Sequence, residues 1–160
     1  MKHKSVLSLL VLLAVVVTGS AQEVIDLSAY DDEGVTITVS DGMTLKDGLI
    51  RCNKVLIAAN ATVTLDNVTI RGVNDDIYPW AGLTCLGDAT IILKDGTTNI
   101  VKGFYDEYPG IYVPSDCTLT IKGGEQGNGT LTVRNNIGAR YHNGRTTKPQ
   151  VKNKGWAAGI

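Results

Sequence analysis

The sequence has few of the residues that most catalytic and metal sites require. Its 160 residues include two histidines, three cysteines and one phenylalanine, and they contain no Cys-x-x-Cys pair. Cys52, Cys85 and Cys117 are too few and too widely spaced for a dense disulfide framework or a zinc site. We expect them to be small buried side chains, with at most one disulfide between neighbouring repeats. Neither His3 nor His142 has a partner nearby for nucleophilic catalysis.

The one long apolar run, Val6 to Val17, lies at the N-terminus and predicts a cleavable export signal. Two lysines and a histidine precede it, and Gly19-Ser20-Ala21 supplies the small residues that a signal peptidase needs. The run is shorter than the roughly 20 apolar residues that span a bilayer, and no cysteine follows it to accept a bacterial lipid anchor. We therefore expect residues 1–21 to be removed. The protein is then secreted, periplasmic or at the cell surface, with no membrane span after cleavage.

The remaining composition is that of a small β-rich domain. Aromatic residues make up 6% of the chain and charged residues 19%, whereas hydrophobic residues reach 43% and glycine occurs 18 times. This composition excludes a wholly disordered chain and fits one domain. Without the two lysines of the export signal, 13 of the 15 basic residues remain against 16 acidic ones, a net charge of −3. That balance gives no reason to expect nucleic acid as a partner.

Short segments in which threonine alternates with an apolar residue predict half-buried β-strands. This alternation places the apolar side chains on one face and the threonines on the other. Clusters of glycine, aspartate and asparagine between the segments supply the turns. No segment after the export signal has a helical period, so we expect essentially no helix. The clearest strand segments are Val35–Val39, Ala61–Leu65, Asn67–Ile70, Cys117–Ile121 and Gly129–Val133.

A recurring step from glycine to an aliphatic residue suggests that these strands belong to a repeat. It occurs at Gly48, Gly82, Gly110 and Gly159, at intervals of 34, 28 and 49 residues. Such intervals fall in or near the range that indicates a solenoid. We therefore predict an all-β, right-handed parallel β-helix, with an N-terminal strand or cap region at 22–47 and repeats over 48–160. A polar, basic insertion at 138–155 explains the longest interval. A β-sandwich is the alternative, but it does not require the recurring step.

The last residues suggest that the repeats continue beyond the sequence. Trp156-Ala157-Ala158-Gly159-Ile160 resembles Trp80-Ala81-Gly82-Leu83, which opens an internal repeat. A solenoid needs a terminal cap over its last repeat, and no such segment is visible. We expect the β-helix to be truncated at Ile160, with any catalytic or anchoring part downstream.

These motifs resemble a family of secreted proteins. The export signal, Gly110-Ile-x-Val-Pro, Leu119-Thr-Ile-x-Gly, Gly129-Thr-Leu-Thr-Val and the final Ala-Ala-Gly-Ile are similar to repeats of gut-bacterial proteins described as carbohydrate-binding domain proteins. Those proteins share the architecture of right-handed, pectate-lyase-like β-helices. The resemblance covers about Leu49 to Ile160. It implies a β-helix at the bacterial cell surface or in the periplasm that contacts glycans, with calcium as a candidate cofactor, and it carries over no catalytic residue.

Two similar loops precede the glycine steps and form the candidate site. Residues 74–80 and 104–109 each contain two acidic residues, a tyrosine and a proline in the same order. If the repeats stack, the loops lie side by side, and their aromatic rings can stack on sugars. The alternative is that the rings pack over the edge of the fold and shield it. The expected carbohydrate-binding residues are Tyr78, Trp80, Tyr105, Tyr108, Tyr112 and Trp156.

Calcium is a candidate ligand of the same loops, because it takes six to eight oxygen ligands. Asp75, Asp76, Asp106 and Glu107 could supply several of them from adjacent repeats. We expect a polysaccharide or cell-surface glycan as partner and no catalysis. The alternatives are an N-terminal fragment of a polysaccharide lyase or glycoside hydrolase, which needs acids at a fixed separation, and an adhesin or structural stalk.

Overall fold

The computed structural model describes residues 22–30, 34–50, 52–73, 77–105, 108–135, 140–142 and 145–147. Its strands confirm the expected all-β class, and the one helical segment among the described residues is the 3-10 helix η1 (Leu27–Tyr30). None of these residues forms a helix long and apolar enough to cross a membrane. The strands are β1 (Val24–Asp26), β2 (Thr36–Val39), β3 (Thr44–Lys46), β4 (Leu49–Ile50), β5 (Lys54–Ile57), β6 (Ala61–Asp66), β7 (Thr69–Arg71), β8 (Leu83–Cys85), β9 (Ala89–Leu93), β10 (Thr98–Lys102), β11 (Ile111–Tyr112), β12 (Leu119–Gly123), β13 (Thr130–Arg134), β14 (Arg140–His142) and β15 (Arg145–Thr147).

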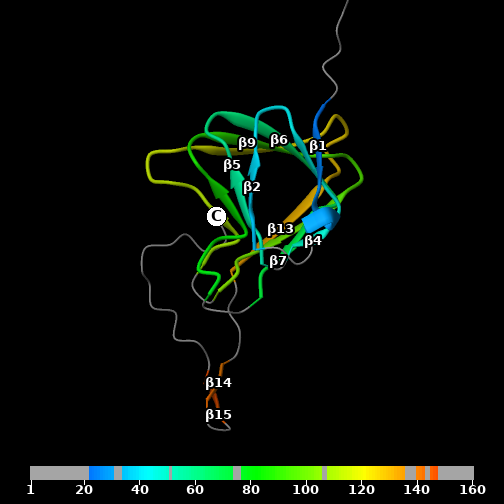
Figure 1. The fold of residues 1–160 in the computed structure, drawn as a ribbon. Helices are drawn as coiled ribbons and strands as arrows, with labels where there is room; N and C mark the ends of the chain where they lie inside the picture. Colours follow the sequence, from blue (N-terminus) through cyan, green and yellow to red (C-terminus); the bar gives the residue numbers. More distant parts are fainter. Residues whose placement is uncertain are drawn as a thin grey trace, which may run out of the picture.

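Strands β1 to β13 form three parallel sheets around a common interior (Figure 1). Sheet 1 has the order β1-β3-β6-β9-β12, sheet 2 β2-β5-β8-β11 and sheet 3 β4-β7-β10-β13. From β2 onward the chain visits sheet 2, sheet 1 and sheet 3 in turn, and we call each such set of three strands a repeat. The antiparallel pairing of a β-sandwich is absent from these thirteen strands.

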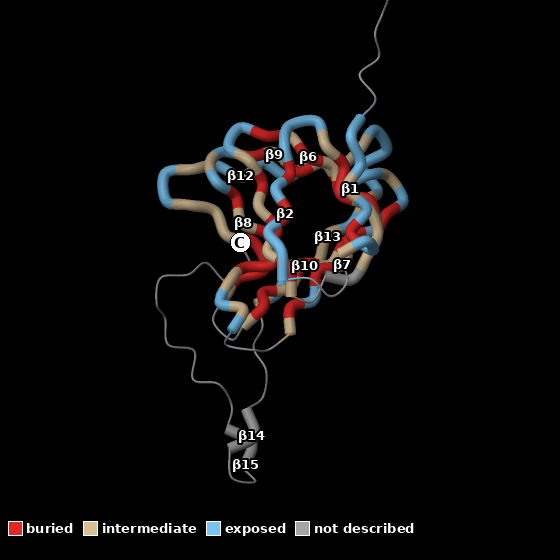
Figure 2. Tube along the Cα trace, in the orientation of Figure 1, coloured by how far each residue is buried: buried red, intermediate tan, exposed pale blue. Residues whose placement is uncertain are grey.

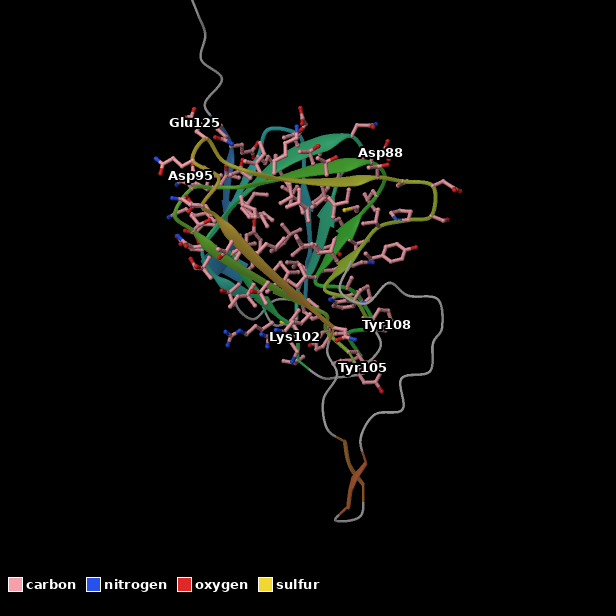
Figure 3. All side chains as sticks on the ribbon, turned by 180° about the vertical axis from the view of Figure 1, so that it is seen from behind. Asp88, Asp95, Lys102, Tyr105, Tyr108 and Glu125 are labelled. Atoms are coloured by element: carbon pink, nitrogen blue, oxygen red, sulfur yellow. The ribbon has the colours of Figure 1, made fainter. Side chains whose placement is uncertain are left out.

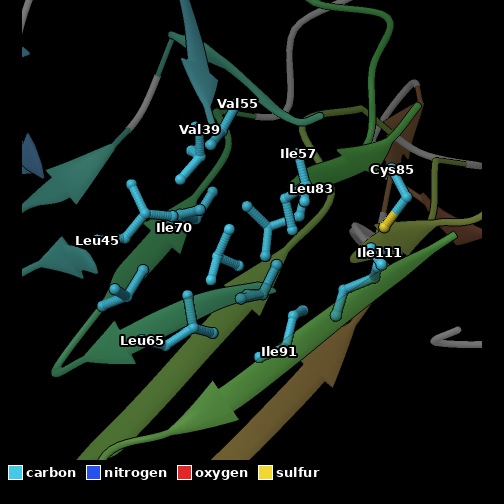
Figure 4. Packing of buried hydrophobic residues seen from close by; sticks show 14 of the residues in the cluster. Val39, Leu45, Val55, Ile57, Leu65, Ile70, Leu83, Cys85, Ile91 and Ile111 are labelled. Atoms are coloured by element: carbon cyan, nitrogen blue, oxygen red, sulfur yellow. The ribbon is translucent and has the colours of Figure 1, made fainter. Parts of the chain in front are cut away.

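The predicted alternation of burial sets the core. In β6 and β9 every second residue from Ala61 and Ala89 is buried, while the residues between them, three threonines and Ile92, are partly exposed. The register of the two strands places buried apolar residues opposite each other, so that Val63 lies opposite Ile91 and Leu65 opposite Leu93. Figure 4 shows Leu65 and Ile91 among the buried hydrophobic side chains inside the sheets, and Figure 2 shows the exposed stretches in the connecting turns.

Buried asparagines add side-chain hydrogen bonds between successive repeats. Asn99 is fully buried, and its Oδ1 accepts a hydrogen bond from the Val68 amide at 2.9 Å. Its Nδ2 donates to the Thr130 carbonyl and to Thr97 Oγ1, both at 3.1 Å. One side chain therefore connects three consecutive repeats. Asn53 has a similar role at the first turn, where it accepts from the Val35 amide.

The assignment of Gly48 to the repeating glycine step is wrong. Gly82 and Gly110 lead into β8 and β11 of sheet 2, but Gly48 leads into β4 of sheet 3, where Leu49 lies opposite Thr69. The second-repeat partner of Leu83 is Val55 instead. Both glycines are needed because a Cβ would come too close to another segment: it would lie 2.7 Å from the Gly110 carbonyl oxygen at Gly82 and 2.5 Å from the Leu27 carbonyl carbon at Gly48, which also has a φ of +76°. Close approach of the backbone in two different sheets thus produces the same local sequence.

The N-terminal segment begins the stack. β1 pairs with β3 in sheet 1, and Leu27 of η1 is fully buried. The three-sheet pattern starts at β2 and β3, upstream of Gly48. Residues 1–21, where we predicted the export signal, lie outside the described residues.

Burial decreases toward the last described repeat. Ile91 is fully buried, but Ile121, opposite it in β12, is 36% exposed. Beyond β13 the described residues of the polar insertion form the antiparallel pair β14 and β15, separate from the three sheets. Residues 148–160, including the final glycine step, lie outside the described residues.

The three cysteines are free thiols, so the disulfide that we considered is not formed. Cys85 is 1% exposed in the core, whereas Cys52 and Cys117 are partly exposed. Burial, with a smaller contribution from the nearby Cys117, raises the pKa of Cys85 from 9.0 to about 11. Its environment is that of an inert core residue.

Candidate functional site

The two loops that we singled out from the sequence lie side by side. The first leads from β7 to β8 and the second from β10 to β11. The Phe104 amide donates to the Trp80 carbonyl at 3.1 Å, and the Gly82 amide donates to the Pro109 carbonyl at 3.3 Å. Both loops follow sheet 3 and precede sheet 2, so stacking of the repeats brings them to one edge. We call this edge, with Tyr78, Trp80, Tyr105 and Tyr108, the aromatic edge.

Part of the aromatic edge is packed rather than free. The Tyr78 and Trp80 rings meet edge to face, with centroids 5.3 Å apart, and Trp80 meets the fully buried Phe104 at 5.7 Å. Both Tyr78 and Trp80 pack against the core. The indole Nε1 of Trp80 is buried and has no hydrogen-bond partner in the described part of the chain. This geometry gives Trp80 a packing role.

The tyrosines of the second loop are not among the partly buried side chains that pack against the core. Tyr105 and Tyr108 are half-buried, and the Tyr108 amide donates to the Tyr105 carbonyl at 2.9 Å, which closes a tight turn. Figure 3 shows both residues at one end of the molecule. Tyr112 is in β11, opposite Thr84 on the outer face of sheet 2. Trp156 lies outside the described residues.

The candidate calcium ligands cannot be placed. Asp75, Asp76, Asp106 and Glu107 all lie outside the described residues. Elsewhere in the described ranges no three His, Cys, Asp or Glu side chains gather as a metal site would need. The calcium site therefore remains a prediction from the sequence.

The structure also forms a polar hollow that sequence reasoning missed. It measures about 350 Å³, is open to solvent, and lies over the start of β9 and β12 in sheet 1. Asp88 Oδ1 accepts a hydrogen bond from the Thr118 amide at 2.7 Å across 30 residues. Only the register between repeats joins these groups, so no local motif reveals them. Its lining residues are Asn60, Asp88, Ala89, Thr90, Thr118 and Thr120.

The register of sheet 3 also brings three basic residues together on its outer face. Arg71, Lys102 and Arg134 occupy equivalent positions at the ends of β7, β10 and β13. Arg71 and Arg134 are exposed. The pairing of the strands places them on either side of Lys102. Lys102 is three residues before Tyr105 in the sequence. We call these three residues the basic column.

No protein-family model, curated protein or solved structure matches this chain.

Proposed function

We propose that this protein is an exported, right-handed parallel β-helix that binds a glycan at the aromatic edge without catalysing a reaction. The rotation of the chain through three parallel sheets supports the β-helix. The handedness rests on a general rule, because crossovers between parallel strands of one sheet are right-handed in about 98% of cases. The resemblance to secreted gut-bacterial carbohydrate-binding domain proteins supports a location in the periplasm or at the cell surface.

One observation carries the glycan proposal: adjacent loops of successive repeats hold aromatic rings at the same edge. Tyr105 and Tyr108 keep part of their surface accessible, and Phe104 and Trp80 hold the loops together from below. A tyrosine ring offers a sugar an apolar face, and its hydroxyl offers a hydrogen-bond donor and acceptor. A rigid edge of this kind binds with little loss of side-chain entropy.

Affinity electrophoresis through gels containing alginate, galactomannan or dextran tests this function. We expect at least one polysaccharide to retard the protein, and the double variant Tyr105→Ala, Tyr108→Ala to lose most of that retardation while keeping the wild-type circular dichroism spectrum. Tyr30→Ala is the matched control, because Tyr30 is a half-buried tyrosine of η1 outside the two loops. Equal retardation of the double variant and the wild type would eliminate the aromatic edge as the site.

The same gels separate the alternatives. Release of unsaturated sugars that absorb in the ultraviolet would identify a lyase rather than a binder. No retardation by any glycan, with capture of a surface protein instead, would favour the adhesin. Export is tested by N-terminal sequencing of the protein recovered outside the cytoplasm, which should begin close to Gln22.

A further inference from the structure

The basic column is an arrangement that a stable fold does not need. Lys102 lies directly opposite Arg71 on one side and Arg134 on the other, and neighbouring strands are about 4.8 Å apart. Like charges placed directly opposite each other repel and destabilise a sheet. Three in succession therefore do not help to stabilise the sheet.

Within the described residues, no carboxylate neutralises the column. The ion pairs found there are Lys46 with Asp47 and Lys94 with Asp66, and neither includes a member of the column. Figure 3 places Lys102 at the same end of the molecule as Tyr105 and Tyr108, whereas the acidic residues Asp88, Asp95 and Glu125 lie toward the other end. Lys102 of the column thus lies at the end of the molecule that carries Tyr105 and Tyr108.

The row of side chains next to the column on the outer face of sheet 3 is uncharged. It consists of Thr69, Ile100 and Thr132, each two residues before a member of the column. Arg71 and Arg134 are exposed and Lys102 is half-buried, so the lysine stem covers the sheet while its ammonium group reaches solvent. The residue after β4, Arg51, is also basic in the sequence and lies outside the described residues.

We infer that the basic column binds an acidic polysaccharide, with its carboxylates or sulfates spaced along the direction in which the repeats stack. This inference rests on the proposed glycan-binding function and names the class of glycan. A linear polyanion matches a straight row of cations better than a compact anion does, because each repeat adds one contact at the same spacing. Arginine at two of the three positions suits this role, since its planar guanidinium binds a carboxylate through two parallel hydrogen bonds. Tyr105 and Tyr108, three and six residues after Lys102, then contact the sugar rings of the same chain.

The inference is tested by measuring the binding of alginate, a polyuronate, and of dextran, a neutral glucan, to the full-length protein at low salt. We expect alginate to bind at least tenfold more tightly than dextran, and its affinity to fall at least tenfold when the salt concentration rises from 0.05 M to about 0.5 M, as screening shortens the reach of the charges. The triple variant Arg71→Gln, Lys102→Gln, Arg134→Gln should lose at least tenfold in alginate affinity.

A second triple variant separates the column from net charge. Lys46→Gln, Lys54→Gln, Lys122→Gln removes the same three charges from sheets 1 and 2, and it should bind alginate within about threefold of the wild type. An equal loss in both variants, or binding by the column variant within twofold of the wild type, would overturn the inference.

Two further readouts keep the outcomes distinct. The column variant should melt at or above the wild-type temperature at low salt, because its substitutions relieve repulsion, so lost binding cannot be attributed to unfolding. If dextran binds as tightly as alginate and only the tyrosine variant loses binding, the column inference fails while the aromatic edge stands. If alginate does not bind, the column inference fails, and the proposed function fails with it only if dextran and galactomannan do not bind either.

Discussion

Replacement of Asn99 tests the stacking of the repeats most sharply, because this one side chain contacts three of them. Asn99→Ala leaves the amide of the fully buried Val68 without a partner, which costs about 1–3 kcal/mol. It also removes the hydrogen bonds from Nδ2 to Thr130 and Thr97, each with a net value of about 0.5–1.5 kcal/mol. We expect a total loss of about 2–6 kcal/mol, a large part of the about 5–15 kcal/mol that stabilises a typical domain.

Urea unfolding followed by circular dichroism measures this loss, and Asn128→Ala is the matched control. Asn128 also joins two repeats, since its Oδ1 accepts from the Gly96 amide at 2.7 Å, but it is exposed. Water replaces that bond, so the control should cost about 1 kcal/mol or less. A loss of less than about 1 kcal/mol for Asn99→Ala, or equal losses for both variants, would refute the bridging role.

Asn99→Asp adds a pH test of the same geometry. The new carboxylate can still accept from the Val68 amide, but when ionised it cannot donate to the Thr130 carbonyl. Burial beside that carbonyl favours the protonated form and raises the pKa of the new carboxyl in the folded state. The deficit relative to the wild type should therefore be smallest below pH about 4 and grow as the pH rises above the unfolded value of about 3.9. A deficit independent of pH would contradict this assignment.

Three further predictions follow from burial. A thiol reagent should label Cys52 and Cys117 at least tenfold faster than Cys85, which is 1% exposed; equal rates would contradict the packing. Because the pKa of Cys85 is raised from 9.0 to about 11, the unfolded chain loses this proton first, so stability should fall by about 2 kcal/mol between pH 9 and pH 11. Cys85→Ala should lack this component in urea unfolding at the two pH values. Ile91→Ala should cost about 2–5 kcal/mol, and Ile121→Ala, at a position 36% exposed, less than half of that in the same assay; equal costs would argue against the open last repeat.

The sequence predicts the strands well because burial alternates along them. Ala61-Thr-Val-Thr-Leu65 places its apolar residues at every second position, and β6 has that pattern. The pairing of strands is harder to predict, because Gly48 and Gly82 occur in the same local sequence but lead into different sheets. Without the correct pairing, the equivalence of Gly82 with Gly110 could be found, but that of Leu83 with Val55 could not.

The candidate site was predictable only where the signal is local. The similar loops around Tyr78 and Tyr108 could be recognised from the sequence and lie side by side as expected. The packing of Trp80 against Phe104 could not be foreseen, because it depends on the relative position of two loops. The basic column has the same limitation: Arg71 and Arg134 follow ordinary strands, and only the register of sheet 3 makes them neighbours of Lys102.

Residue-resolved mapping of a bound glycan by nuclear magnetic resonance tests the central claim most directly. On titration with a short alginate oligosaccharide, amide shifts should change at Tyr105, Tyr108 and Lys102, and the signals of Thr90 and Thr120 in the hollow of sheet 1 should stay unchanged. Changes confined to Thr90 and Thr120, or none at saturating oligosaccharide, would contradict the placement of the glycan along the aromatic edge and the basic column.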